Sequence, residues 1–261
     1  KYEDPEYSIT QTPLNEQDLK TMSEAVEVLR QFKGFSYFTE MSDIINRLED
    51  HVASARMKTT PVIDFEKNES LKGLDYLDTI YHAIVNEHPI QLKYRSFKAR
   101  SANSFIFYPY LLKEYRNRWF VYGVRGNGRI LQNLALDRIQ SLEVLPQQHY
   151  IKNTFFDPNT FFDDLVGVTK NSGSVAEKVG FKVAAAEAPY IITKPIHRSQ
   201  QVVERLADGS VILEIEVVIN HELEQVFFGY AEGIHVLYPK TLVELMGRKL
   251  KKAAEQYTHS K

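Results

Sequence analysis

The spacing of apolar residues changes along this 261-residue chain, and that change limits what the chain can fold into. Before residue 88, apolar side chains recur every three or four positions, which predicts three helices at about 14–34, 38–52 and 71–86. From 90 to 145 they alternate with polar side chains, which predicts five short strands, enough to close a small β-barrel. The sequence therefore predicts an α+β protein in which N-terminal helices precede a barrel.

The last third of the chain combines both periods, as expected of a separate αβ unit. A turn is predicted at Asp208-Gly209, between two of its strands. Residues 151–170, ahead of this unit, are rich in Phe and irregular. We expect strands at about 177–184, 197–205, 211–219 and 235–238, and helices at about 188–194, 223–230 and 241–257.

Composition narrows the class of protein. Hydrophobic residues make up 43% and charged residues 25%, the balance of a soluble globular chain. No apolar run approaches the length of a membrane span, and residues 1–13 contain no apolar signal core. There is no cysteine, which excludes disulfides and thiolate metal sites. Together these features predict a cytoplasmic location without a membrane partner.

Positive charge is concentrated in one part of the chain. Residues 88–140 hold ten Lys or Arg and two acids, Glu114 and Asp137, a net charge of +8 (10 − 2). Because the whole chain has a formal net charge of −2, the remainder carries −10 (−2 − 8). This asymmetry indicates an anionic partner for the basic part.

Several motifs in the strand-rich region fall in a characteristic order. They are Tyr94 in the first strand, Pro109, the run Trp119-Phe120-Val121, and the run Leu136-Asp-Arg-Ile139. With these landmarks, residues 79–146 resemble a WYL domain, an SH3-like barrel of the Sm type named for a Trp-Tyr-Leu run. Residues 175–258 look like the C-terminal extension that often follows it. They match in His197-Arg-Ser-Gln200, Asp208-Gly209, Phe227-Phe-Gly229, Val236-Leu-Tyr-Pro239 and the closing helix.

The resemblance implies the effector-sensing part of a bacterial transcriptional regulator, which is a binding protein and not an enzyme. It implies a single-stranded nucleic acid or nucleotide effector, and promoter DNA bound through an N-terminal headpiece that this sequence largely lacks. Apolar stripes on the first two helices predict a homodimer. The expected domains are a helical linker and dimerisation region (1–70, with the end of a wing at 1–10), the WYL barrel (71–146), a linker (147–174) and the C-terminal extension (175–261).

Arginines and aromatic residues form the predicted ligand site. Arg forks bind phosphate oxygens bidentately and stack on bases, and aromatic faces hold bases without sequence preference. In the extension, His197 and Arg198 are candidates for a second ligand contact. In the barrel we expect the anionic ligand to contact Tyr94, Arg95, Tyr110, Arg116, Arg118, Trp119, Arg125 and Arg138.

Structural interpretations of the same residues stay open. Trp119 can be a core residue of the barrel. Arg138 can be held by Asp137 or Glu114, since an Asp-Arg pair often orders a turn. A lone histidine such as His197 is more often structural than functional.

Two other functions also stay open. One is a Mg²⁺-dependent enzyme acting on phosphodiesters through Asp163 and Asp164, and the other is a structural accessory or dimerisation module without a ligand. The eight histidines show no metal-ligand spacing. Phosphate-loop, dinucleotide and nucleophile-elbow motifs are missing from the sequence, so we predict no catalytic residue, metal or cofactor.

Overall fold

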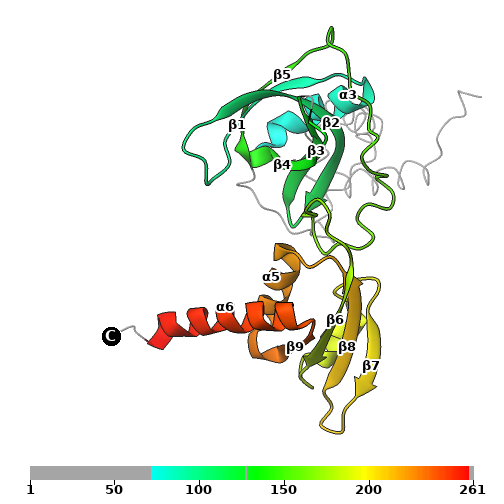
Figure 1. Ribbon diagram of the computed structural model, residues 1–261, viewed down its shortest axis with the longest axis vertical. Helices are drawn as coiled ribbons and strands as arrows, with labels where there is room; N and C mark the ends of the chain where they lie inside the picture. The colour runs from blue at the N-terminus through cyan, green and yellow to red at the C-terminus, as the bar shows by residue number, and fades with distance from the viewer. Residues whose placement is uncertain (1–71, 127, 259–261) are drawn as a thin grey trace, which may run out of the picture. The chain divides into compact units, whose positions relative to one another are not determined.

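The computed structural model describes residues 72–126 and 128–258 (Figure 1). The helices expected at 14–34 and 38–52 lie outside these residues. The described residues divide into two compact units, one of residues 72–121 with 134–150 and the other of residues 122–126, 128–133 and 151–258. They are called the first and the second unit below.

The helix predicted at 71–86 begins as a 3-10 turn, η4 (Leu74–Tyr76), and continues as α3 (Leu77–Val85). It ends at Val85, ahead of Pro89 as expected, and Glu87 after it has a φ of 53°, which does not continue a helix. Leu77 and Ile80 are fully buried on its inner face. They anchor the helix to the core of the first unit.

The five predicted strands are all present and form one antiparallel sheet in the order β4-β3-β2-β1-β5. The central core residues Ile90, Leu92, Phe107 and Val121 are completely buried. In the described residues β4 and β5 are the edges of this sheet, so the closed barrel that we expected is not found. The SH3 or Sm type of the fold stays a prediction. The strands are β1 (Ile90–Tyr94), β2 (Asn103–Tyr115), β3 (Arg118–Arg125), β4 (Leu131–Ala135) and β5 (Ile139–Val144).

The hairpin between β2 and β3 is tighter than the sequence suggests. Only Arg116 and Asn117 separate the two strands, with φ of 49° and 60°. Positive φ at both positions is the requirement of the type I′ hairpin turn. The backbone N–H of Asn117 also donates to Oε1 of Glu114 at 2.5 Å. The turn that we expected at 126–128 includes residue 127, which lies outside the described residues.

The second unit contains a four-stranded antiparallel sheet in the order β7-β8-β6-β9. The inner face of the sheet and three helices share one core, with Phe181, Leu213 and Phe227 at its centre. The strands are β6 (Glu177–Val183), β7 (Gln201–Arg205), β8 (Val211–Val217) and β9 (Ile234–Tyr238), and the helices are α4 (Ala188–Thr193), α5 (His221–Gly229) and α6 (Lys240–Thr258). The sequence predicts all seven elements, and six of them lie within two residues of their predicted bounds; β7 is shorter than predicted. A further 3-10 turn, η6 (Ala231–Gly233), precedes β9.

On the outer face of this sheet an aromatic ring covers a glycine. Gly180 in β6 is paired with Glu214 and with Tyr238. A Cβ atom at Gly180 would lie 2.1 Å from the Tyr238 ring, so a larger residue there would require the ring to move. The Tyr238 hydroxyl donates to Oε2 of Glu214 at 2.7 Å, and Lys178 pairs with Oε1 at 2.8 Å.

The Phe-rich segment 151–170 has no helix or strand, as predicted. Its rings pack around Tyr122, whose hydroxyl donates to the carbonyl of Val168. Asn133 donates to the same carbonyl at 2.8 Å. Residues 122 and 133 thereby tie this segment into the second unit. Nowhere in the described parts of the chain is a helix both long and apolar enough to cross a membrane.

Candidate ligand-binding site

Two of the predicted arginines share one carboxylate in the first unit. Nε of Arg118 lies 3.2 Å from Oδ2 of Asp137, and Nε of Arg138 lies 3.8 Å from its Oδ1. Asp137 is mostly buried, whereas 49% of the Arg118 side chain is exposed. Arg138 is therefore held by Asp137, one of the two acids that the sequence offered for it. One negative charge faces two positive charges at this point.

The backbone fixes the position of Asp137 and Arg138. Both belong to the 3-10 turn η5 (Leu136–Arg138), which joins β4 to β5. The N–H of Arg95 donates to the carbonyl of Arg138 at 3.1 Å, which ties this turn to the end of β1. A shift of register between Lys93 and Tyr94 brings Tyr94 opposite Ile139, beside the same turn.

A glycine makes room for η5 from the other side. Gly73 has a φ of 83°, a conformation that residues other than glycine rarely adopt. A Cβ atom there would lie 2.4 Å from the backbone carbon and oxygen of Leu136. The start of η4 therefore packs directly against the backbone that carries Asp137.

An exposed aromatic ring lies beside Arg138. The guanidinium carbon of Arg138 is 4.6 Å from the centroid of the Phe97 ring, within the range of a cation–π contact. Phe97 is 73% exposed. The Nε of Arg138 is buried and, within the described residues, makes no hydrogen bond. Phe97 was not among the residues predicted from the sequence, although it is an aromatic residue in the same loop as Arg95, Lys98 and Arg100.

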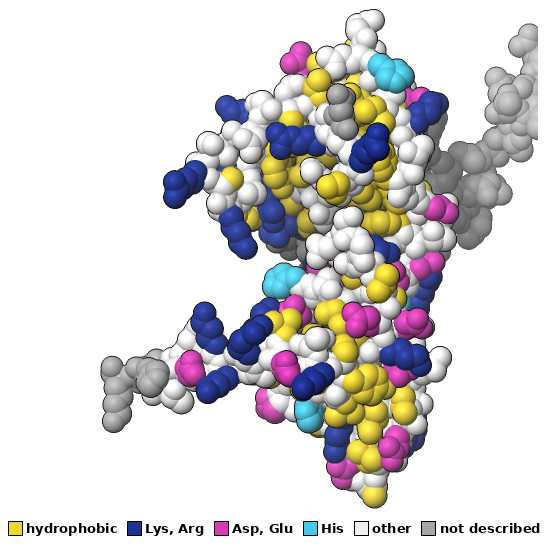
Figure 2. Space-filling model, in the orientation of Figure 1, with side chains coloured by type: hydrophobic (Ala, Val, Ile, Leu, Met, Phe, Trp, Pro, Cys, Tyr) yellow, Lys and Arg dark blue, Asp and Glu magenta, His cyan; other side chains and the backbone are white. Residues whose placement is uncertain are grey.

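Tyr94 completes this group from β1. Burial raises the pKa of its hydroxyl, and the nearby charge of Arg138 and a hydrogen bond to Ala135 oppose the shift. Tyr94, Phe97, Arg118, Asp137 and Arg138 are called the Arg138 cluster below. Exposed Lys93, Arg95, Lys98 and Arg100 occupy β1 and the loop after it. Figure 2 shows Lys and Arg side chains over the first unit, beside apolar surface.

Four other residues predicted in the strand region have surroundings of their own. Tyr110 is buried against Tyr150 with ring centroids 6.1 Å apart, and burial raises its pKa to about 12. Trp119 is half-buried and packs against the core of the first unit, the structural alternative for this residue. Arg116 lies in the β2–β3 turn over the Tyr115 ring, and Arg125 is exposed at the end of β3.

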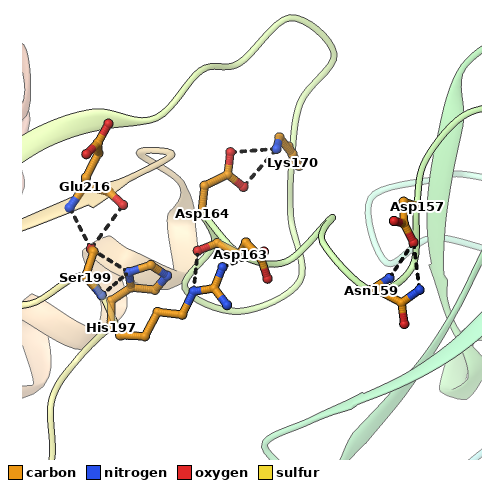
Figure 3. A network of polar contacts seen from close by, with 9 residues as sticks. Asp157, Asn159, Asp163, Asp164, Lys170, His197, Ser199 and Glu216 are labelled. Carbon is orange, nitrogen blue, oxygen red and sulfur yellow. Dashed lines mark hydrogen bonds and ion pairs between the residues drawn. The ribbon is translucent and has the colours of Figure 1, made fainter.

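His197 and Arg198 belong to a separate polar network in the second unit (Figure 3). Nδ1 of His197 accepts from the backbone N–H of Ser199 at 3.2 Å and lies 2.7 Å from its hydroxyl. Burial lowers the pKa of His197, and the adjacent Arg198 lowers it further. The Ser199 hydroxyl contacts the backbone of Glu216 in β8. These contacts form a turn, so β7 begins at Gln201 and not at His197 as predicted.

The two adjacent acids of the enzyme alternative face different cations. Oδ2 of Asp163 lies 2.6 Å from Nη2 of Arg198. Both carboxylate oxygens of Asp164 accept from Nζ of Lys170 at 2.8 Å (Figure 3). No group of three or more metal-ligating side chains occurs within residues 72–126 and 128–258. Salt bridges therefore account for both carboxylates.

Comparisons with protein families agree with this architecture. Residues 75–144 match the model of the WYL domain, and residues 176–254 match the model of the WCX domain. The chain is a WYL-domain protein in which a WCX domain follows the WYL domain.

Two solved structures are similar to this chain. Proteasome accessory factor B/C (PafBC) of Arthrobacter aurescens is 16% identical, with a TM-score of 0.30 over 74% of this chain and 28% of its own length. A CRISPR Cas-related protein is 10% identical, with a TM-score of 0.45 over 93% of this chain and 86% of its own length. This chain thus spans less than a third of PafBC. No curated protein matches it.

Proposed function

We propose that this chain is the effector-sensing part of a bacterial transcriptional regulator and binds a nucleic-acid-derived anion at the Arg138 cluster. The observation behind the proposal is that, among residues 72–126 and 128–258, Arg118 and Arg138 form ion pairs with a single carboxylate, that of Asp137. A phosphate group presents several oxygens to such a pair of guanidinium groups and binds them bidentately. The ligand would then take over contacts that Asp137 now makes.

The aromatic residues favour a nucleotide or a single strand over inorganic phosphate. Phe97 is exposed beside Arg138, and Tyr94 lies on the strand next to it. Stacking of a base on an aromatic ring adds about 1–3 kcal/mol to binding and tolerates any base. A base could therefore stack on Phe97 while the neighbouring phosphate of the same ligand contacts Arg138.

The proposal extends to the whole protein. In the proposal the chain works as a cytoplasmic homodimer, and an N-terminal headpiece contacts promoter DNA. The second unit, with His197 and Arg198 as a second ligand contact, would couple ligand binding to the other copy of the homodimer. The Mg²⁺-dependent alternative is less favoured because Asp163 and Asp164 are each neutralised by a cation.

Binding of fluorescein-labelled short single strands to the whole chain tests the proposal. Arg138→Ala should weaken binding by about 1–3 kcal/mol, because it removes a charge-assisted contact. Arg118→Ala should weaken it by a similar amount and leave the thermal midpoint nearly unchanged, since exposed charges contribute little to folding. Arg205→Ala, an exposed arginine in β7, is the matched control and should leave affinity unchanged. Undetectable binding of oligonucleotides and nucleotides at low salt would instead support the accessory-module alternative.

A further inference from the structure

The second half of α6 is not covered by the rest of the second unit. Leu242 and Met246 are buried in its first half and join the core of the unit. Residues 250–258 are all exposed, including Leu250 at 41% and Tyr257 at 85%. At a rise of about 1.5 Å per residue, this exposed part extends about 13 Å. Figure 1 shows α6 running outward from the sheet to the C-terminus.

Positive charge is concentrated on this helix. Arg248, Lys249, Lys251 and Lys252 lie within five consecutive residues, and Glu255 is the only acid from Gly247 to Thr258. Lys249 is bonded to the carboxylate of Glu224 in α5. The other three are exposed and form no ion pair or hydrogen bond with any described residue. Figure 2 shows Lys and Arg side chains along α6.

The three cations that have no counter-ion among the described residues share one side of the helix. At about 100° per residue, Arg248, Lys251 and Lys252 fall within about 100° of one another. Leu250 and Tyr257 fall on the opposite side, in line with buried Met246. The cationic side is therefore free to meet a ligand while the first half of α6 stays in the core.

We propose that the exposed half of α6 binds the phosphate backbone of duplex nucleic acid. The complementarity of charge carries this inference: three cations on one helix face match closely spaced phosphates. An α-helix with its side chains is about 10–12 Å across, and the major groove of B-DNA is about 12 Å wide. This surface is separate from the Arg138 cluster, and it contacts the backbone without reading base sequence.

Two protein partners fit this surface less well. A second copy of α6 would bring like charges together, which is unfavourable at low salt. A helix that binds in a protein groove presents large apolar anchors at successive turns. Here Ala253 and Ala254 lie between Leu250 and Tyr257, so the apolar contact is small.

Salt-dependent binding of a short mixed-sequence DNA duplex to the full chain tests the inference. In Arg248→Gln/Lys251→Gln/Lys252→Gln, the plot of log Kobs against log salt should become less steep by about 2.7, because each phosphate contact contributes about 0.9. Affinity at low salt should fall by at least about tenfold. Gln preserves helix propensity, so the circular dichroism spectrum and the thermal midpoint should stay unchanged.

A second triple variant separates contact from overall charge. Lys182→Gln/Lys194→Gln/Arg205→Gln removes the same charge from elsewhere in the second unit and should leave the salt slope unchanged. Equal slopes in the two triple variants would overturn the inference, as would no duplex binding by the unchanged chain. It would also be overturned if Leu250→Ser/Tyr257→Ser abolished binding while the α6 triple variant retained it. Arg138→Ala should keep the contribution of α6, so this test is independent of the proposed effector site.

Discussion

On the outer face of the second sheet each lysine of β6 has its own carboxylate, whereas in the first unit two arginines share one. Lys178 pairs with Glu214 at 2.8 Å and Lys182 with Asp208 at 3.5 Å. Arg118 and Arg138 both contact Asp137. Matched pairs on a surface neutralise each other and contribute little to folding or binding. Two guanidinium groups around one carboxylate instead carry a net positive charge, which can bind an added anion.

The largest expected effects come from the separate cores of the two units. Phe107 and Phe181 are both completely buried, one in each core. Replacing either by Ala should lower the free energy of unfolding by about 3–5 kcal/mol. Because the proposed ligand site lies in the first unit, only Phe107→Ala should also abolish binding of the labelled single strand. Calorimetry and binding titrations on the same samples check this, and equal loss of binding in both variants would contradict it.

Gly73→Ala should disturb the first unit at the site itself. The added Cβ would meet the backbone of Leu136, which cannot move without displacing Asp137 and Arg138. We expect a loss of about 1–3 kcal/mol in unfolding free energy, together with weaker ligand binding. Gly173→Ala is the matched control: its φ is 79°, but nothing lies within 4 Å of the added atom. Unchanged ligand binding in Gly73→Ala would show that η5 does not position the site.

Asp137→Asn tests the shared carboxylate directly. Removing its charge leaves Arg118 and Arg138 without their counter-ion, so a phosphate ligand should bind more tightly, by about 1 kcal/mol at low salt. Asp164→Asn in the second unit breaks the matched pair with Lys170 and should leave affinity unchanged. Anisotropy titrations of both variants measure the difference. Weaker binding in Asp137→Asn would mean that the carboxylate supports the ligand.

The smallest effect is a pH dependence confined to the second unit. Burial holds the pKa of His197 below its ordinary value of 6.5, and Nδ1 already accepts a hydrogen bond from Ser199. The unfolded chain therefore binds a proton more readily, and the second unit should lose stability as pH falls below about 6.5. His197→Gln should flatten this part of the profile of thermal midpoint against pH. A profile that stays unchanged in His197→Gln would assign the dependence to other groups.

Most elements could be predicted from the sequence because the spacing of apolar residues shows which side chains are buried. In the second unit, six of the seven strands and helices were predicted within two residues of their bounds, whereas β7 starts later than predicted because residues 197–200 form a turn. The full length of β2, Asn103–Tyr115, was missed because residues 107–110 in its middle are all buried, which breaks the alternation. The turn at Arg116-Asn117 was missed because it lacks the glycine that usually marks a type I′ hairpin.

The candidate site was harder to predict than the fold. The count of basic residues pointed to the region that holds the Arg138 cluster, and the sequence raised Asp137 as a possible partner of Arg138. Which arginines meet depends on long-range packing: Arg118 starts β3, while Arg138 follows β4. Phe97 was passed over because its importance comes from the contact with Arg138, which no local pattern encodes.

A crystal structure of the whole chain with a short single-stranded oligonucleotide is the most direct test of the central claim. We predict a phosphate within hydrogen-bonding distance of both Arg118 and Arg138, with the Asp137 carboxylate displaced from at least one of them. A base should stack against Phe97. A bound oligonucleotide whose phosphates contact neither arginine would contradict the account.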